Sequence, residues 1–150
     1  ESGAICQYLC ETFDKEDKLG RSLGHKEHAE WLQWLHYAET VAVHGASLVQ
    51  QNIIIAEELR SPVVIKLESR RLEKAIEVLN DHLNGREYLL ESGFSAVDTA
   101  VGYSIHMGSM FIKISEYKNV VSYYNKIKNR EAFRKSLPKD VNDPLEEIEV

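Results

Sequence analysis

The stretch that decides the fold class is Phe94-Ser95-Ala96-Val97-Asp98 together with the run that follows it, Thr99 to Ile112. A serine followed three residues later by a carboxylate has the spacing at which the two side chains cap the first turn of a helix reciprocally. The run from Thr99 to Ile112 is apolar or small on nearly every face, with glycines and serines that allow close helix contacts. A helix of that kind is buried on all sides. We therefore expect a capping box, Ser95 with Asp98, that opens a buried central helix.

Four other segments have apolar residues at helical spacing, and no alternation typical of strands is sustained anywhere. We expect helices over Gly3 to Phe13, from about Lys26 onward, from Ser61-Pro62 to Asn84-Gly85, and over Asn119 to Lys128, with a final turn at Glu131 to Phe133 that Pro138 closes. The helix that begins near Lys26 carries an apolar stripe as far as Ile53, which predicts about nine turns. The sequence thus predicts an all-α bundle of about five to six helices with a buried central helix.

Composition places the 150-residue chain among single globular domains, with 43% hydrophobic and 28% charged residues. Its formal net charge of −6 makes nucleic acid and anionic lipid surfaces unlikely partners by electrostatics. The longest runs without charged residues are too short and too polar to span a bilayer, so we expect no membrane partner and no signal peptide. Residues 139–150 are acidic and are expected to form an exposed tail.

Cys6 and Cys10 are the only cysteines, four residues apart on a predicted helix. That spacing exceeds the usual reach of a disulfide, so the sequence favours a reducing compartment and a cytoplasmic location. A redox role is possible for the pair, but small buried side chains are the more common use of such a spacing. His25, Glu27 and His28 could hold a stray metal ion, but we interpret them as solvated residues at a helix start and expect no metal.

Taken in order, four stretches resemble the C-terminal part of cytosolic glutathione transferases. They are Glu1-Ser2-Gly3-Ala4-Ile5 with Tyr8-Leu9, Trp31-Leu32-Gln33-Trp34-Leu35, Phe94-Ser95 with Asp98, and Val120 to Phe133. The resemblance spans residues 1–138. Two positions depart from the family pattern, because Glu91 stands where the family usually has glycine, with Gly93 instead, and Arg130-Glu131 stands where it usually has Arg-Pro.

The resemblance implies a domain division and a function. Residues 1–13 would be the last helix of a thioredoxin-like domain, 14–24 a linker, 25–138 the helical domain, and 139–150 the acidic tail. The intact protein would be a homodimer, built partly from the first two helices, that conjugates glutathione, its co-substrate, to a small hydrophobic electrophile in detoxification. The residue that activates sulfur would belong to the thioredoxin-like half, so we expect the chain by itself to be inactive and to lack sequence upstream.

The same resemblance implies two groups of site residues. Glu1 and Ser2 would bind the γ-glutamyl end of glutathione, since free amides at a helix start and a hydroxyl suit a carboxylate. The alternative is that Ser2 is only an N-cap. Tyr37, Val41 and His44 share a helix face, with Trp34 beside them, and these four residues would form the pocket for the second substrate. The alternative is that this face packs in the core or in a dimer interface and that His44 is structural.

The sequence leaves two other interpretations open. Helical domains of this type also serve as non-catalytic assembly modules in translation-factor and synthetase complexes, with the same fold. The pair Glu1 and Ser2 favours the enzyme, because an assembly module has no need for a turn suited to a ligand's carboxylate. The chain could also be a truncated or proteolysed species without a function of its own.

Overall fold

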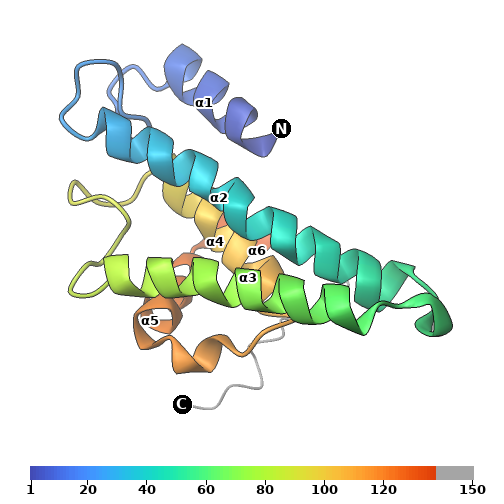
Figure 1. Ribbon diagram of the computed structural model, residues 1–150. Helices are drawn as coiled ribbons and strands as arrows, with labels where there is room; N and C mark the ends of the chain where they lie inside the picture. Colours follow the sequence, from blue (N-terminus) through green and yellow to red (C-terminus); the bar gives the residue numbers. More distant parts are fainter. Residues whose placement is uncertain (138–150) are drawn as a thin grey trace.

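The computed structural model describes residues 1–137, which form six α-helices and no strand (Figure 1). The helices are α1 (Ser2–Phe13), α2 (His28–Val49), α3 (Pro62–His82), α4 (Ala96–Gly108), α5 (Lys118–Lys128) and α6 (Glu131–Ser136). A π-helical turn, Gln50–Ile54, and two 3₁₀ turns, Glu57–Leu59 and Ile114–Glu116, lie between them. The predicted all-α bundle is confirmed. Pro138 and the predicted acidic tail lie outside the described residues.

Helix α4 is the central helix of the bundle. It packs against α1, α2 and α5, and nine of its 13 residues are buried. Its exposed face carries Thr99 and Tyr103. The helix begins at Ala96 and ends at Gly108, earlier than the predicted end at Ile112. The Ser109 hydroxyl donates to the carbonyl of His106 at 2.7 Å, which helps to satisfy a backbone acceptor of the last turn.

The capping box of Ser95 and Asp98 is present as predicted. The Asp98 carboxylate accepts hydrogen bonds from the amide of Ser95 at 2.7 Å, the amide of Leu89 at 3.1 Å and the hydroxyl of Tyr123 at 3.1 Å. Burial raises the pKa of Asp98, while these hydrogen bonds oppose the rise. The box therefore starts α4 and also ties it to the preceding loop and to α5.

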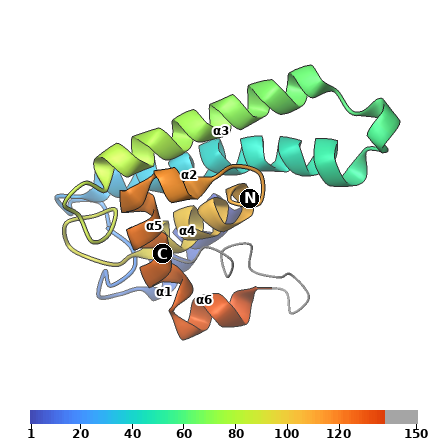
Figure 2. The same cartoon turned by 90° about the horizontal axis from the view of Figure 1, so that it is seen from below.

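Helices α2 and α3 form a long hairpin that extends beyond the rest of the bundle in both views (Figures 1 and 2). Helix α2 has 22 residues, about six turns, so the predicted nine turns are wrong. The helix ends in the π-helical turn, where the amide of Ile55 donates a hydrogen bond to the carbonyl of Gln50. The backbone of Ile55 itself is extended. The side chain of Gln51 then accepts a hydrogen bond from the amide of Ser61 at 2.9 Å. This bond fixes the path of the chain from the turn to the start of α3.

The ends of α3 follow the local signals in the sequence. Ser61 is the N-cap, its hydroxyl accepts the amide of Val64 at 3.4 Å, and Pro62 is the first helical residue. After the helix, Gly85 has a φ of +74°, a left-handed conformation that glycine adopts without strain. Gly93, two residues before the cap of α4, has a φ of +103°, which explains why this loop carries glycine there.

The loop between α1 and α2 is anchored on the start of α4. The carbonyl of Leu19 accepts hydrogen bonds from the Trp31 indole at 3.0 Å and from the amide of Ala96 at 2.9 Å. The buried side chain of Arg21 pairs with buried Glu27 at 3.5 Å and donates to the hydroxyl of Ser92. These contacts hold α1 against α2 and α4. Among residues 1–137, no helix has the length and apolar character needed to cross a bilayer.

Candidate functional site

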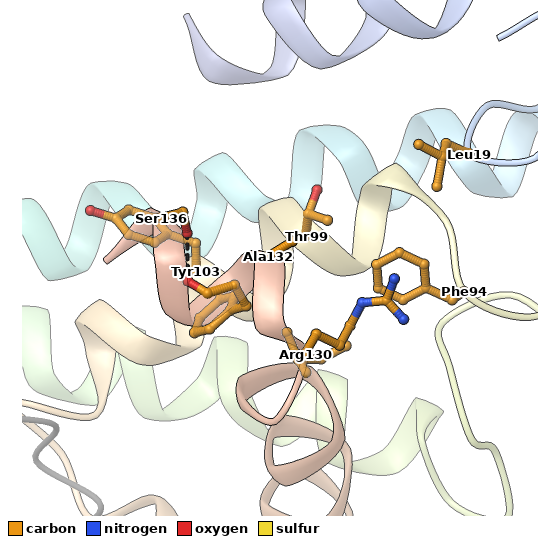
Figure 3. A pocket seen from close by; sticks show the side chains of 9 residues that line it. Leu19, Phe94, Thr99, Tyr103, Arg130, Ala132 and Ser136 are labelled. Atoms are coloured by element: carbon orange, nitrogen blue, oxygen red, sulfur yellow. Dashed lines mark hydrogen bonds between the residues drawn. The ribbon is translucent and has the colours of Figure 1, made fainter. Parts of the chain in front are cut away.

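The exposed face of α4 borders a cavity of about 520 Å³ (Figure 3). Helix α4 contributes Thr99 and Tyr103, which are one helical turn apart. The other lining residues come from the loops and from α5 and α6. The apolar lining residues are Leu19, Phe94, Ile127, Ala132 and Phe133, and the polar ones are Thr99, Tyr103, Arg130 and Ser136. The cavity thus has mainly apolar walls and one cationic side chain.

Arg130 lies over the ring of Phe94, with its guanidinium carbon 3.6 Å from the ring centroid (Figure 3). This contact is a cation–π interaction. Arg130 occupies the N-cap position of α6 with an extended backbone. No ion pair found among residues 1–137 involves Arg130.

Two of the three hydroxyl groups that line the cavity, those of Thr99 and Ser136, donate to backbone carbonyls. Thr99 donates to the carbonyl of Ala96 at 2.6 Å, and Ser136 donates to the carbonyl of Phe133 at 2.7 Å. None of the described lining residues is a histidine, cysteine, aspartate or glutamate. The arrangement is suited to binding an apolar molecule and offers no pair of side chains for general acid–base catalysis.

A second hollow, of about 410 Å³, shares Tyr103 with the first cavity. Its lining comes from α2 and the following π turn, with Ala42, Ala46, Val49, Gln50 and Ile54, and from α4, with Tyr103, Ser104 and Met107. The small alanine side chains leave room between the two helices. Tyr103 lines both hollows, so they are neighbours along one face of α4.

The residues predicted to bind glutathione lie at the start of α1. Glu1 takes the N-cap position and Ser2 is the first helical residue, and both are exposed. The alternative that Ser2 is the N-cap is therefore wrong, because the N-cap is the residue before it. Glu1 makes no side-chain capping hydrogen bond. Neither residue lines the two hollows. Their role in glutathione binding stays a prediction.

The residues predicted to form the second-substrate pocket lie between α2 and α3. The Trp34 ring is 5.3 Å from the Tyr37 ring and 4.3 Å from that of His82, centroid to centroid. The Tyr37 hydroxyl donates to the carbonyl of Ala75 at 3.1 Å, and Val41 is fully buried. None of the four predicted residues lines either hollow. Core packing, the alternative left open from the sequence, accounts for their positions, and a role toward a substrate stays a prediction.

His44, the fourth of these residues, pairs with α3. Its Nδ1 lies 2.8 Å from a carboxylate oxygen of Glu68, and Arg71 contacts the other oxygen. The hydrogen bond from His44, with help from Arg71, lowers the pKa of Glu68. Local sequence patterns do not predict this pair, because its members are 24 residues apart on different helices. The cavity residues Tyr103 and Arg130 were not predicted either. For Tyr103 the one available signal was a large polar-tipped side chain on the otherwise small and apolar central helix, and for Arg130 there was none.

The other candidate residues have structural surroundings. Cys6 is half-buried, Cys10 is buried, and both are free thiols; burial raises both thiol pKa values, that of Cys10 to about 11. Nδ1 of His25 accepts the amide of Glu27, and Nδ1 of His28 lies 2.6 Å from the carbonyl of Arg21. Within residues 1–137 there is no group of three or more potential ligands that could hold a metal ion.

Comparison with known proteins places this geometry in a known fold. No family model and no curated protein matches the chain. A solved glutathione transferase homologue from Lodderomyces elongisporus, crystallised with two GSH per subunit, matches with a TM-score of 0.80 over 90% of this chain, at 20% identity. The chain has the glutathione transferase fold. It corresponds to the helical domain of that fold, as the sequence predicted.

Two other glutathione transferase structures show the same likeness. The enzyme from Pseudomonas putida, with one glutathione disulfide bound per subunit, matches at TM-score 0.79 and 22% identity over 94% of this chain. Ure2p5 from Phanerochaete chrysosporium, cocrystallised with 1-(S-glutathionyl)-2,4-dinitrobenzene, matches at TM-score 0.80 and 19% identity over 91% of it. The chain covers 64%, 62% and 66% of these three structures, so it spans less than two thirds of each.

Proposed function

We propose that this chain is the substrate-binding and dimerisation domain of a glutathione transferase, and that the cavity beside Thr99 and Tyr103 holds the second substrate. The observation that carries the proposal is the TM-score of about 0.8 to transferases crystallised with glutathione or its conjugate. The mainly apolar lining of the cavity supports an apolar electrophile as the second substrate.

The outer face of α1 supports the proposed domain division. Its apolar residues Ile5, Tyr8, Leu9 and Phe13 are between 48% and 68% exposed. An exposed apolar face of this size marks a surface that another element covers. In the proposal, the remainder of a thioredoxin-like domain covers it, α1 is the last helix of that domain, residues 14–24 are the linker and residues 25–138 are the helical domain.

The start of α1 faces glutathione in this arrangement. The unpaired amides of the first turn and the Ser2 hydroxyl suit the carboxylate of the γ-glutamyl end, and Glu1 pairs with the ammonium group beside it. The glutathione thiolate then attacks the electrophilic carbon, a sulfur–carbon bond forms, and the leaving group departs with its electron pair. This chain contributes the walls that hold the electrophile in place, which raises its effective concentration near sulfur.

A conjugation assay tests the proposal. The open reading frame that contains residues 1–150 is expressed, and formation of 1-(S-glutathionyl)-2,4-dinitrobenzene is followed. We expect Ala132→Trp, which fills the cavity, to lower kcat/KM by about tenfold, a loss of about 1.4 kcal/mol of transition-state binding. Ser122→Trp, at an exposed position of α5 outside the cavity, is the matched control. A folded protein without conjugating activity would overturn the proposal and favour a non-catalytic assembly module.

The proposal includes a homodimer in the cytoplasm, built partly from α1 and α2. Val43, on the outer side of α2, is 51% exposed, and Ile53 and Ile54 after it are 65% and 70% exposed. A second copy that covers these side chains would bury apolar surface. Sedimentation equilibrium should give twice the mass of one chain, and Val43→Glu should shift the equilibrium toward the monomer. A monomer at all concentrations would contradict this part of the proposal.

A further inference from the structure

The one Asn–Gly sequence of the chain, Asn84-Gly85, lies in an exposed turn directly after α3 (Figure 1). The amide of Arg86 donates to the carbonyl of Leu83 at 3.0 Å, so Asn84 and Gly85 are the two central residues of the turn. Gly85 has a φ of +74°, a conformation that residues with a side chain rarely adopt. The turn therefore holds a glycine directly after an asparagine at the surface of the protein.

The groups of this pair that could react with each other are free of hydrogen bonds. Among residues 1–137, neither the Asn84 carboxamide nor the Gly85 amide takes part in one. Gly85 also lacks the Cβ atom that would shield its nitrogen, and the space around that position is open to at least 4 Å. Gly85 lines a hollow of about 380 Å³ together with polar side chains that include Arg86 and Glu91. Water consequently reaches both residues.

We propose that Asn84 is a site of spontaneous covalent modification, in which the amide nitrogen of Gly85 attacks the carboxamide carbon of Asn84. A bond forms between these two atoms, the bond from that carbon to the side-chain nitrogen breaks, and ammonia leaves with the amide proton. Water then opens the resulting cyclic imide at either of its carbonyl carbons. The product is aspartate, or isoaspartate with the main chain running through the former β-carbon. The reaction consumes only water, and the inference does not depend on the proposed function.

The position of the turn gives the modification a structural consequence. Residues 83–88 form a short loop that is closed by a 2.8 Å contact between Nε2 of His82 and the carbonyl of Leu89. The amide of Leu89 in turn donates to the Asp98 carboxylate, which caps α4. An isoaspartate adds a methylene group to the main chain inside this closed loop. It also adds a negative charge after the C-terminal end of α3, where the helix dipole disfavours one. The modification therefore weakens the anchor of α4.

Incubation of residues 1–150 at about pH 6 and at about pH 8, followed by peptide mass spectrometry, tests the chemistry. We expect the Asn84 peptide to gain the mass that replacement of a carboxamide by a carboxyl group produces. The reaction should be at least about tenfold faster at the higher pH, because attack requires the deprotonated amide and the deprotonated fraction of so weak an acid rises with pH. Methylation by a protein-isoaspartate methyltransferase with S-adenosylmethionine identifies the isoaspartate form.

Asn129 is a matched internal control in the same samples. It is also exposed and also stands at the end of a helix, as the C-cap of α5. The amide that follows it, that of Arg130, donates to the carbonyl of Ile127 at 3.1 Å and belongs to a residue with a side chain. We expect the Asn129 peptide to stay unmodified while the Asn84 peptide is converted.

Thermal unfolding of fresh and aged samples tests the structural consequence. We expect the Tm of the converted protein to lie about 2–4 °C below that of fresh protein, the shift that the loss of about one hydrogen bond produces in a chain of this size. Asn84→Gln is the matched variant, because its longer side chain keeps the carboxamide but cannot form the same ring. Aged Asn84→Gln should show no mass gain at this position and no change in Tm.

Four results would overturn the inference. Absence of conversion at both pH values, or equal conversion of Asn84 and Asn129, would contradict the assignment of the site. Conversion only in denaturant would show that the folded turn holds the two groups apart. An equal fall in Tm for aged wild type and aged Asn84→Gln would place the damage elsewhere in the chain.

Discussion

At the scale of single residues, Asp98 makes the most consequential contacts in the structure. Its carboxylate is fully buried and accepts hydrogen bonds from a loop amide, a cap amide and a tyrosine hydroxyl. The spacing from Ser95 predicts the cap alone. Leu89 and Tyr123 are partners that only the folded chain brings together. Asp98 therefore links the start of α4 to the preceding loop and to α5, in addition to capping the helix.

We therefore expect Asp98→Ala to lower the free energy of unfolding by about 3 kcal/mol, more than the 1–2 kcal/mol of a lost cap. The excess arises because the substitution leaves several buried donors without an acceptor. Chemical denaturation near neutral pH measures the effect. Asp81→Ala, at an exposed position of α3, is the control and should change stability little. A loss below 1 kcal/mol for Asp98→Ala would show that these donors find other partners.

The pair of His44 and Glu68 makes stability depend on pH. The hydrogen bond from His44, first, and the contact with Arg71 hold the pKa of Glu68 below its ordinary value of 4.5. A carboxyl whose pKa is depressed by folding stabilises the folded state above its unfolded pKa, and the contribution is lost as the pH falls through the folded pKa.

We expect Glu68→Gln to lower the free energy of unfolding by roughly 1 kcal/mol at pH 6, the upper range for a partly exposed pair. The difference from the wild type should shrink as the pH falls below about 4.5 and be lost as the pH passes through the lowered pKa of Glu68 in the folded state. Thermal unfolding of both proteins from pH 3 to pH 7 measures it. A difference that is independent of pH would mean that the carboxylate charge of Glu68 does not contribute.

At the scale of helices, the contact of α4 with α5 depends on the absence of a side chain at Gly102. A Cβ atom there would lie 2.6 Å from Cγ2 of Ile127, closer than atoms can approach. Gly45 in α2 presents the opposite case, because a Cβ atom at that position would meet nothing within 4 Å. The same residue type thus serves close packing in one helix and has no packing role in the other.

These two glycines yield a matched pair of substitutions. Gly102→Ala should destabilise the protein by about 1 kcal/mol, since an overpacking cost of about 1–3 kcal/mol exceeds the gain of up to 1 kcal/mol in helix propensity. Gly45→Ala should stabilise it by up to about 1 kcal/mol, because only the propensity gain applies. Adding Ile127→Leu, which has no Cγ2, should reduce the cost of Gly102→Ala. Denaturant titration of the double-mutant cycle shows whether the two sites couple.

At the scale of the whole molecule, α1 differs from the other helices because one whole side of it is apolar and exposed. It packs on α2 and α4 through one side, which includes Cys6 and Cys10, while its outer side is apolar and exposed. The loop that follows it is held by Arg21 and Glu27, and α1 itself stays packed on α2 and α4. The start of α1, with Glu1 and Ser2, is consequently presented to solvent.

We expect residues 1–150 alone to bind glutathione too weakly for titration calorimetry to detect. The start of one helix offers only a few amides and a hydroxyl, and charge interactions at an exposed helix end are worth about 0.3–1 kcal/mol. Such a contribution is far below the roughly 8 kcal/mol that micromolar affinity requires. Micromolar binding by this chain would contradict the proposed domain division and place the glutathione site within the helical bundle.

The sequence by itself determined the helical class, the Ser95–Asp98 capping box, and the start of α3 at Ser61 and Pro62. Each of these depends on interactions within one or two helical turns, which neighbouring residues specify completely. The resemblance to glutathione transferases was likewise visible in the order of those local motifs, and the fold comparison confirmed it.

Only the tertiary structure decided where α2 ends, that His44 faces Glu68, and that Arg130 and Tyr103 border one cavity. His44 and Glu68 lie 24 residues apart in sequence and Tyr103 and Arg130 lie 27 apart, and no local spacing encodes either pairing. A cavity is, moreover, the space that several packed helices leave unfilled, so its position depends on all of their side chains together. For this reason the predicted substrate face of α2 proved to be part of the α2–α3 contact, while the open surface lies on α4.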